Sequence, residues 1–177
     1  MTQQFPLYLI IVLPLLGAVL NLLFGRRFGN GFVSLVACGA VAAAALVATL
    51  GVFTLASEVP RGMLVDELIS GDFMLAGDLK LAAGLMLDPL SSVLVLIVTW
   101  IALLIHIYAT GYMEHEPDYA RFFGYLNLFT GAMLILVLGD SLPITFIGWE
   151  GVGLASYLLI GFWYTEDKNA TAGRKAF

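Results

Sequence analysis

Five apolar runs, each about as long as a membrane-spanning helix, constrain the fold of this chain more than any other feature. A helix rises 1.5 Å per residue, so a run of about twenty apolar residues matches the hydrocarbon core of a bilayer. Lipid offers no partner for backbone N–H and C=O groups, and the runs are therefore expected to be helices. We place the five spans at residues 5–24, 32–55, 88–110, 122–139 and 141–164.

The composition agrees with an integral membrane protein. The chain is 60% hydrophobic and 12% charged, and its mean hydropathy is +0.96, whereas soluble domains are about 45–50% apolar. The net charge of −5 is spread over short polar stretches rather than gathered on a basic face, which argues against a nucleic-acid partner. The single cysteine, Cys38, excludes an intrachain disulfide and any cysteine-held metal or iron–sulfur cluster.

The positions of the Lys and Arg residues predict the orientation, because cytoplasmic loops carry an excess of these residues. If the N-terminus is external, only Arg61 and Lys80 lie outside and six of the eight basic residues are cytoplasmic. The six are Arg26, Arg27, Arg121, Lys168, Arg174 and Lys175. We therefore expect a multi-pass protein of a bacterial inner (plasma) membrane, with an external N-terminus and the Phe177 end in the cytoplasm.

The connection 56–87 is then external, and its sequence indicates local strand structure. The stretch DFMLAGDLKLAAGLMLD has two short apolar runs on either side of Ala76-Gly77-Asp78, which predicts a β-hairpin. No linker or low-complexity tract divides the chain. The sequence thus predicts an all-α integral membrane protein with one external β-hairpin, and residues 1–177 form a single transmembrane unit.

The strongest functional candidate is Glu150, in the string GWEGVGLASYLLIGFWY at residues 148–164. It lies well inside the fifth span, where an ionised carboxylate costs about 3 kcal/mol on insertion scales. Gly153, one turn away, leaves room for a neighbouring helix or water beside it. We interpret Glu150 as a proton-relay carboxylate. The alternative is a neutral glutamate that only donates a hydrogen bond between helices.

Other polar residues are weaker candidates. His106, near the cytoplasmic end of the third span, is either a proton-relay group or an interfacial histidine bonded to backbone. Lys175 is a third candidate, on the expected cytoplasmic side. His115 falls in a loop and is expected to be solvated. Asn127 and Thr130 are one turn apart and are interpreted as structural groups that bond a neighbouring helix.

Residues 85–177 resemble a known family. The stretch LDPLSSVLVLIVTWIALLIHIYATGYMEHEPDYARFFGYLNLF, followed by GWEGVGLASYLLIGFWY and RKAF, is similar to the L-type antiporter-like subunit of respiratory complex I, called chain 5 in mitochondria. The first eighty residues match in layout only. The resemblance implies a longer antiporter-like helical bundle, of which this chain is the N-terminal portion, truncated before the sixth helix. It also implies that Glu150 matches the family's fifth-helix glutamate, which pairs with a lysine on a later helix.

The resemblance implies a function that this chain would share with partner subunits. The expected activity is proton translocation coupled to quinone reduction, within an NADH:quinone oxidoreductase. No cofactor is expected in this chain, whereas FMN and iron–sulfur clusters belong to partner subunits and quinone acts elsewhere in the complex. The expected partners are other complex I membrane subunits and membrane lipid. Two alternatives stay open: the large subunit of an Mrp-type Na⁺/H⁺ antiporter, and a purely structural membrane subunit.

Overall fold

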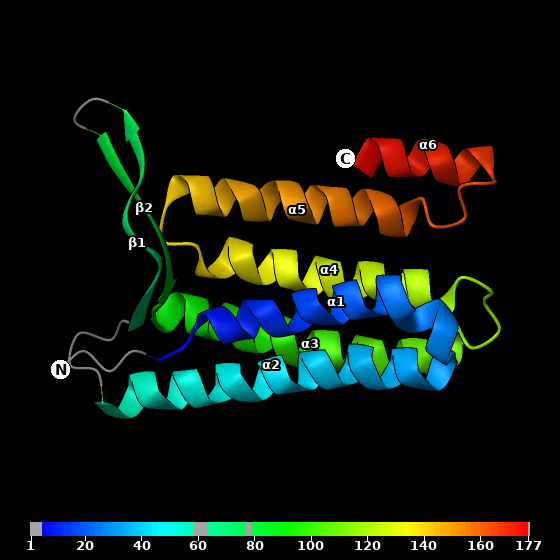
Figure 1. The fold of residues 1–177 in the computed structure, drawn as a ribbon, viewed down its shortest axis with the longest axis horizontal. Helices are drawn as coiled ribbons and strands as arrows, with labels where there is room; N and C mark the ends of the chain where they lie inside the picture. Colours follow the sequence, from blue (N-terminus) through cyan, green and yellow to red (C-terminus); the bar gives the residue numbers. More distant parts are fainter. Residues whose placement is uncertain (1–4, 59–63, 77–78, 177) are drawn as a thin grey trace.

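The computed structural model describes residues 5–58, 64–76 and 79–176 of the chain. Five of its helices are long and apolar enough to cross a membrane, as predicted. They are α1 (Tyr8–Phe28), α2 (Asn30–Glu58), α3 (Pro89–Tyr112), α4 (Tyr119–Leu138) and α5 (Leu142–Ile160). Figure 1 shows them side by side as a bundle, with their long axes nearly parallel. The prediction of an all-α membrane fold is confirmed.

The predicted hairpin is also present. Strands β1 (Leu64–Ala76) and β2 (Leu79–Leu87) pair antiparallel and lie across one end of the bundle (Figure 1). The base of β2 is fixed to the connection between α4 and α5, because Asp140 accepts a hydrogen bond from the Gly84 N–H at 3.0 Å and donates its own N–H to the Gly84 carbonyl at 3.2 Å. Leu85 and Leu87 are fully buried in the core at this end.

Helix α4 is the central element. It packs against α1, α3 and α5, while α2 lies against α1 and α3. The approach of α1 to α4 is close: a Cβ atom at Gly25 would lie 2.6 Å from Cβ of Ala120, and one at Gly124 would lie 2.6 Å from Cγ of Leu22. Small residues permit such contacts in a membrane, where no hydrophobic force drives helices together. The position of α4 therefore determines which faces of α3 and α5 are covered by this chain and which are left uncovered.

The connections at the ends of the helices explain the observed boundaries. Helices α1 and α2 are separated only by Gly29, whose φ of +82° favours glycine. Helix α3 begins after Asp88, whose Oδ1 accepts the Ser91 N–H at 2.7 Å, while Oγ of Ser91 accepts the Asp88 N–H at 2.8 Å. This reciprocal pair is a capping box, followed by proline at the first helical position.

The C-terminal region differs from the sequence prediction. Helix α5 ends at Ile160 rather than 164, because the chain turns at Gly161. The segment expected to be a cytoplasmic tail contains a further helix, α6 (Asp167–Ala176), which packs against α5. A Cβ at Gly173 would lie 3.2 Å from Cα of Gly161, so α6 reaches α5 at a pair of glycines. Figure 1 shows α6 beside the C-terminal end of α5.

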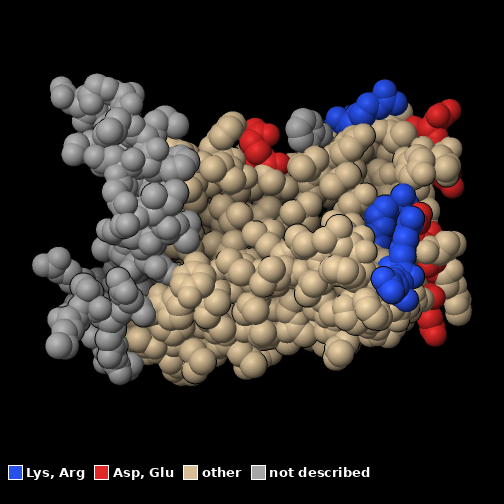
Figure 2. Space-filling view, in the orientation of Figure 1, with Lys and Arg blue, Asp and Glu red and all other residues tan. Residues whose placement is uncertain are grey.

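Charge is distributed unevenly along the bundle. Figure 2 shows that Lys and Arg side chains gather toward the end away from the hairpin, while the middle of the visible face carries few charges. At the charged end, Asp118 joins two helices, since it pairs with Arg26 at 2.9 Å and with Arg121 at 2.9 Å. The hairpin and the basic cluster thus lie at opposite ends, as the orientation argument requires, although the side on which each end lies stays a prediction.

Candidate functional site

Helix α5 contacts α4 along a face of small residues. A Cβ atom at Gly148 would collide with the backbone of Leu136, and a Cβ at Gly151 would lie 3.0 Å from Cβ of Ala132. Ile144, Gly148 and Ala155 are the buried residues of α5. The face of α5 that includes Gly148 is therefore the one that meets the rest of this chain.

Glu150 lies on the opposite face. It follows Gly148 by two residues, or about 200° around a helix, and its side chain is exposed within this chain. The same side of α5 carries large apolar residues that are also exposed, among them Phe146 at 61% and Leu154 at 46%. The site, where we expect a neighbouring helix or water beside the carboxylate, is thus an uncovered apolar surface within this chain, roughly 12–15 Å along the helix from either end.

No partner for Glu150 occurs in the part of the chain that the structure describes. Neither a hydrogen bond nor an ion pair joins its carboxylate to another described residue. Lys175, the third candidate, is exposed on α6 and forms no ion pair with Glu150. A cation for Glu150 would have to come from outside the described residues.

His106 is fully buried within the bundle, on α3. Its Nδ1 bonds the Ala102 carbonyl of its own helix at 2.7 Å, and its ring lies 6.2 Å from the ring of Phe123 on α4. It also lines a mostly apolar cavity of about 200 Å³ between α3 and α4, together with Thr130. The backbone bond fits the structural alternative, and the Asn127 side chain lies beside the ring as a second polar neighbour.

Two asparagines accompany His106 in the interior. Asn127 on α4 donates from Nδ2 to the Ala37 carbonyl of α2 at 3.4 Å, as predicted for a residue that bonds a neighbouring helix. Thr130 instead bonds its own helix, at the Leu126 carbonyl. Asn21 on α1 is fully buried and neither of its amide atoms has a partner. Sequence reasoning missed Asn21, although a lone polar residue in an apolar helix is itself a signal of function.

The structure does not bring the predicted candidates together. Helices α3 and α5 both pack on α4, and His106 meets it near Phe123 while the α5 helix of Glu150 meets it near Ala132. His115 lies in the turn after α3 and is exposed, as expected. Glu150 and His106 are thus two separate sites on one bundle.

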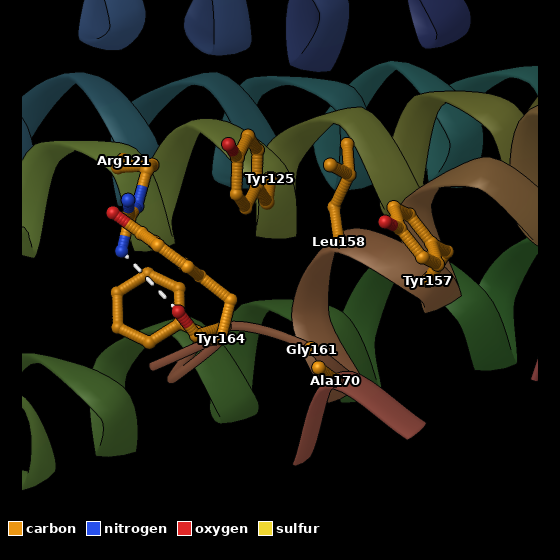
Figure 3. Close-up of a pocket in the computed structure, with 8 residues that line it drawn as sticks. Arg121, Tyr125, Tyr157, Leu158, Gly161, Tyr164 and Ala170 are labelled. Atoms are coloured by element: carbon orange, nitrogen blue, oxygen red, sulfur yellow. Dashed lines mark hydrogen bonds between the residues drawn. The ribbon is translucent and has the colours of Figure 1, made fainter. Parts of the chain in front are cut away.

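A pocket of about 200 Å³ lies at the charged end, between α4 and the α5–α6 connection. Figure 3 shows Arg121 beside Tyr164, with Tyr125, Leu158 and Tyr157 along the rest of the lining. The Arg121 guanidinium donates to the Phe162 carbonyl at 3.3 Å and lies over the Phe162 and Tyr164 rings, 4.7 and 5.3 Å from their centroids. Together with its ion pair to Asp118, these contacts make Arg121 an anchor for the α5–α6 connection.

Within residues 5–58, 64–76 and 79–176, no group of three or more His, Cys, Asp or Glu side chains is placed to hold a metal ion. The described residues offer instead two isolated titratable groups, His106 inside the apolar bundle and Glu150 on an uncovered apolar face of it. Such groups can accept and release protons, and intramembrane ionisable residues commonly mark proton or ion routes.

Comparison with known proteins identifies two family segments. Residues 73–123 match the model described as NADH-ubiquinone oxidoreductase (complex I), chain 5 N-terminus, and residues 139–177 match the one described as NADH:quinone oxidoreductase/Mrp antiporter, TM. The second segment contains Glu150 and Lys175, and the first contains His106.

Full-length relatives extend the match over nearly the whole chain. NADH-quinone oxidoreductase subunit L of Mycobacterium tuberculosis is 46% identical over 172 residues, which cover 96% of this chain and 26% of the relative. The Escherichia coli subunit L is also 46% identical, covering 97% and 27%. NADH-ubiquinone oxidoreductase chain 5 of Dictyostelium discoideum is 36% identical, covering 94% and 24%. This chain thus spans about a quarter of the length of these relatives.

A solved structure shows the same fold at low sequence identity. One chain of the membrane-bound sulfane sulfur reductase, an archaeal respiratory membrane complex, superposes with a TM-score of 0.76 at 16% identity. The superposition covers 96% of this chain and 33% of that chain. The similarity is therefore one of overall fold, over almost the whole of this chain.

Proposed function

Because the chain belongs to the family of NADH-quinone oxidoreductase subunit L and NADH-ubiquinone oxidoreductase chain 5, we propose that it forms part of a proton-translocating membrane subunit. In this proposal the subunit couples quinone reduction, carried out elsewhere in a respiratory complex, to the movement of protons. The observation that carries the proposal is Glu150, a single carboxylate in the middle of an uncovered apolar helix face.

The position of Glu150 argues for a protein or water environment on that face of α5. An ionised carboxylate that faced lipid here would cost about 3 kcal/mol or more. Further helices of a longer protein would cover the exposed side chains of α5 and could supply a cation. A nearby lysine favours the charged carboxylate, whereas its absence in an apolar site favours the neutral acid. Movement of that lysine would therefore make Glu150 bind or release a proton.

His106 and Lys175 are the other two groups that we propose to carry protons, each at a place separate from Glu150. His106 would exchange protons through Nε2, inside the bundle and nearer the basic end. Lys175 would act at the cytoplasmic surface, near the opening of the route. Transfer of one proton against 100 mV costs about 2.3 kcal/mol, and this energy would come from partner subunits. We propose that those subunits carry FMN and iron–sulfur clusters, and that this chain contributes no redox group.

An Mrp-type Na⁺/H⁺ antiporter is the second candidate, because the family model that matches residues 139–177 includes both kinds of protein. Affinity purification of the native protein that contains this chain, from mildly solubilised membranes, distinguishes them. Copurification with flavin and iron–sulfur subunits and with NADH:quinone reductase activity is the expected result. Sodium-dependent proton exchange by purified protein in vesicles, without such subunits, would instead identify an antiporter.

A further inference from the structure

The pocket at the charged end of the bundle has the composition of an anion site. It lies between α4 and the α5–α6 connection, and its lining includes the cationic side chain of Arg121. None of the described residues that line it is acidic. Its volume of about 200 Å³ is far larger than the share of one water molecule in the liquid, about 30 Å³. The pocket therefore has room for a small polyatomic group.

The hydrogen bonds of Arg121 leave part of its guanidinium for a ligand. Nη2 donates to the Asp118 carboxylate at 2.9 Å and to the Phe162 carbonyl at 3.3 Å. Nε is buried, whereas Nη1 forms no hydrogen bond or ion pair with another described residue. The guanidinium also lies over the Phe162 and Tyr164 rings, which hold it in place. Nη1 thus offers its N–H groups from a fixed position, and such charged donors bind phosphate oxygens strongly.

The charges beside the pocket leave an excess of positive charge. The single carboxylate of Asp118 pairs with both Arg26 and Arg121, each at 2.9 Å, and it cannot neutralise two guanidinium groups. Glu116 accepts a hydrogen bond from the Trp163 indole at 3.2 Å, and it forms no ion pair with Arg121 among the residues that the structure describes. An anion in the pocket would balance the remaining charge.

The level of the pocket along the helices indicates the source of such an anion. Arg121 lies in the first turn of α4, and Gly161 directly follows the last residue of α5, so the pocket lies at the ends of two spanning helices. Trp163 and Tyr164 come next in the chain, and these residue types are enriched where lipid headgroups meet water. Basic pockets between membrane helices on the cytoplasmic side bind anionic headgroups.

We propose that this pocket binds a phosphate group, to which Nη1 of Arg121 donates. Tyr125 and Tyr164 also line the pocket (Figure 3), and their hydroxyl groups can donate to further phosphate oxygens. The phosphodiester of a phospholipid headgroup has this chemistry, and so does free phosphate. The site is separate from Glu150 and His106, and the proposal holds whether or not the subunit moves protons. A bound phosphate group would fasten α4 to the α5–α6 connection.

Protection of Arg121 from chemical modification tests the site. Phenylglyoxal modifies arginine side chains, and peptide mass spectrometry gives the rate at each position of the native assembly, washed in dodecyl maltoside to remove bound lipid. Arg27, an exposed arginine in the last turn of α1, is the reference. Phosphatidylglycerol should slow the modification of Arg121 several-fold relative to that of Arg27.

Inorganic phosphate, compared with chloride at equal ionic strength, distinguishes the two sources. Equal protection of Arg121 by inorganic phosphate and by the lipid would show that the free ion is sufficient. Protection by phosphatidylglycerol alone would identify a lipid headgroup site. Protection by neither probe would overturn the proposal.

Two variants with the same change of charge show whether Arg121 holds the phosphate. Arg121→Gln removes the guanidinium from the pocket, whereas Arg27→Gln removes one from the same end of the bundle outside it. Phosphorus bound to the purified assembly, measured by elemental analysis, counts both sources and should be lower in Arg121→Gln than in Arg27→Gln. Equal amounts in the two variants would also overturn the proposal. If Arg121→Gln prevents assembly, the protection of Arg121 in the wild-type assembly still decides the matter.

Discussion

Glu150 and His106 belong to two helices that pack on different parts of α4, and no contact joins the two side chains. Gly148 and Gly151 of α5 bring their helix to Leu136 and Ala132, and Glu150 faces away from this contact. His106 reaches α4 from α3, beside Phe123. The two proposed proton-carrying groups therefore occupy separate environments, one covered within this chain and the other not.

Disulfide trapping tests the orientation of α5. In a background with Cys38→Ser, the pair Gly151→Cys and Ala132→Cys should oxidise readily. An added Cβ at 151 lies 3.0 Å from Cβ of Ala132, so a small separation of the two helices reaches the distance of about 3.5–4.5 Å between Cβ atoms that disulfides span. The matched pair Glu150→Cys and Ala132→Cys should not oxidise. Equal crosslinking of both pairs, read as a mobility shift on non-reducing gels, would contradict the assigned faces.

Gly148 should be intolerant of a side chain. Gly148→Ala places a methyl group against the Leu136 backbone, and overpacking of this kind typically costs about 1–3 kcal/mol. The control is Gly39→Ala, at an exposed helix position with nothing within 4 Å of the added atom; it should be neutral or gain up to about 1 kcal/mol. Thermal unfolding in detergent measures both, and equal stability of the two variants would refute the close packing.

The start of α3 should make stability depend on acid. The Ser91 backbone N–H and then its hydroxyl, both bonded to the carboxylate, hold the pKa of Asp88 below its ordinary value. The pKa of Asp88 is thus lower in the folded state than in the unfolded state. Its contribution to the free energy of unfolding is fully present above the unfolded-state pKa of about 3.9, and it is lost as the pH falls through the folded-state pKa.

Two variants isolate this contribution. Asp88→Ala should lower stability at neutral pH by about 1 kcal/mol, the usual effect of removing an N-cap. Asp88→Asn keeps the accepting oxygen but cannot titrate. Its unfolding temperature should therefore fall less between pH 5 and pH 3 than that of the wild type. The difference between the two falls measures the contribution of the Asp88 charge. Identical acid profiles for the wild type and Asp88→Asn would show that the cap is not charged.

The orientation remains a prediction that impermeant thiol labelling of intact cells can test. In the Cys38→Ser background, Ser70→Cys should react if the connection 56–87 is external, and Thr171→Cys should react only after the membrane is permeabilised. The opposite pattern would place the basic end outside and reverse the proposed direction of the route.

The spans and the hairpin were predictable because bilayer thickness fixes the length of an apolar helix and because the strand pattern is local. The face of α5 on which Glu150 lies, relative to α4, was not predictable from the sequence. It depends on which face of α5 packs against α4, and the sequence has glycines on both sides of that helix. Gly148 and Gly151 make the contact, whereas Gly153 lies on the side of Glu150. The helix α6 was missed because its polar composition resembles a tail. The burial of Asn21 and His106 depends on how the helices pack, which no local pattern specifies.

The central claim is that Glu150 carries protons, and the decisive measurement is proton uptake by membrane vesicles that contain the assembled complex, normalised to the amount of complex. Glu150→Gln keeps the size and hydrogen-bonding capacity of the side chain but cannot titrate, and it breaks no ion pair among the described residues. We expect assembly with proton uptake and the coupled quinone reduction reduced by more than half, and Glu150→Asp should retain more activity than Glu150→Gln. Equal proton uptake by the wild type and Glu150→Gln would mean that the carboxylate is structural and would contradict the account.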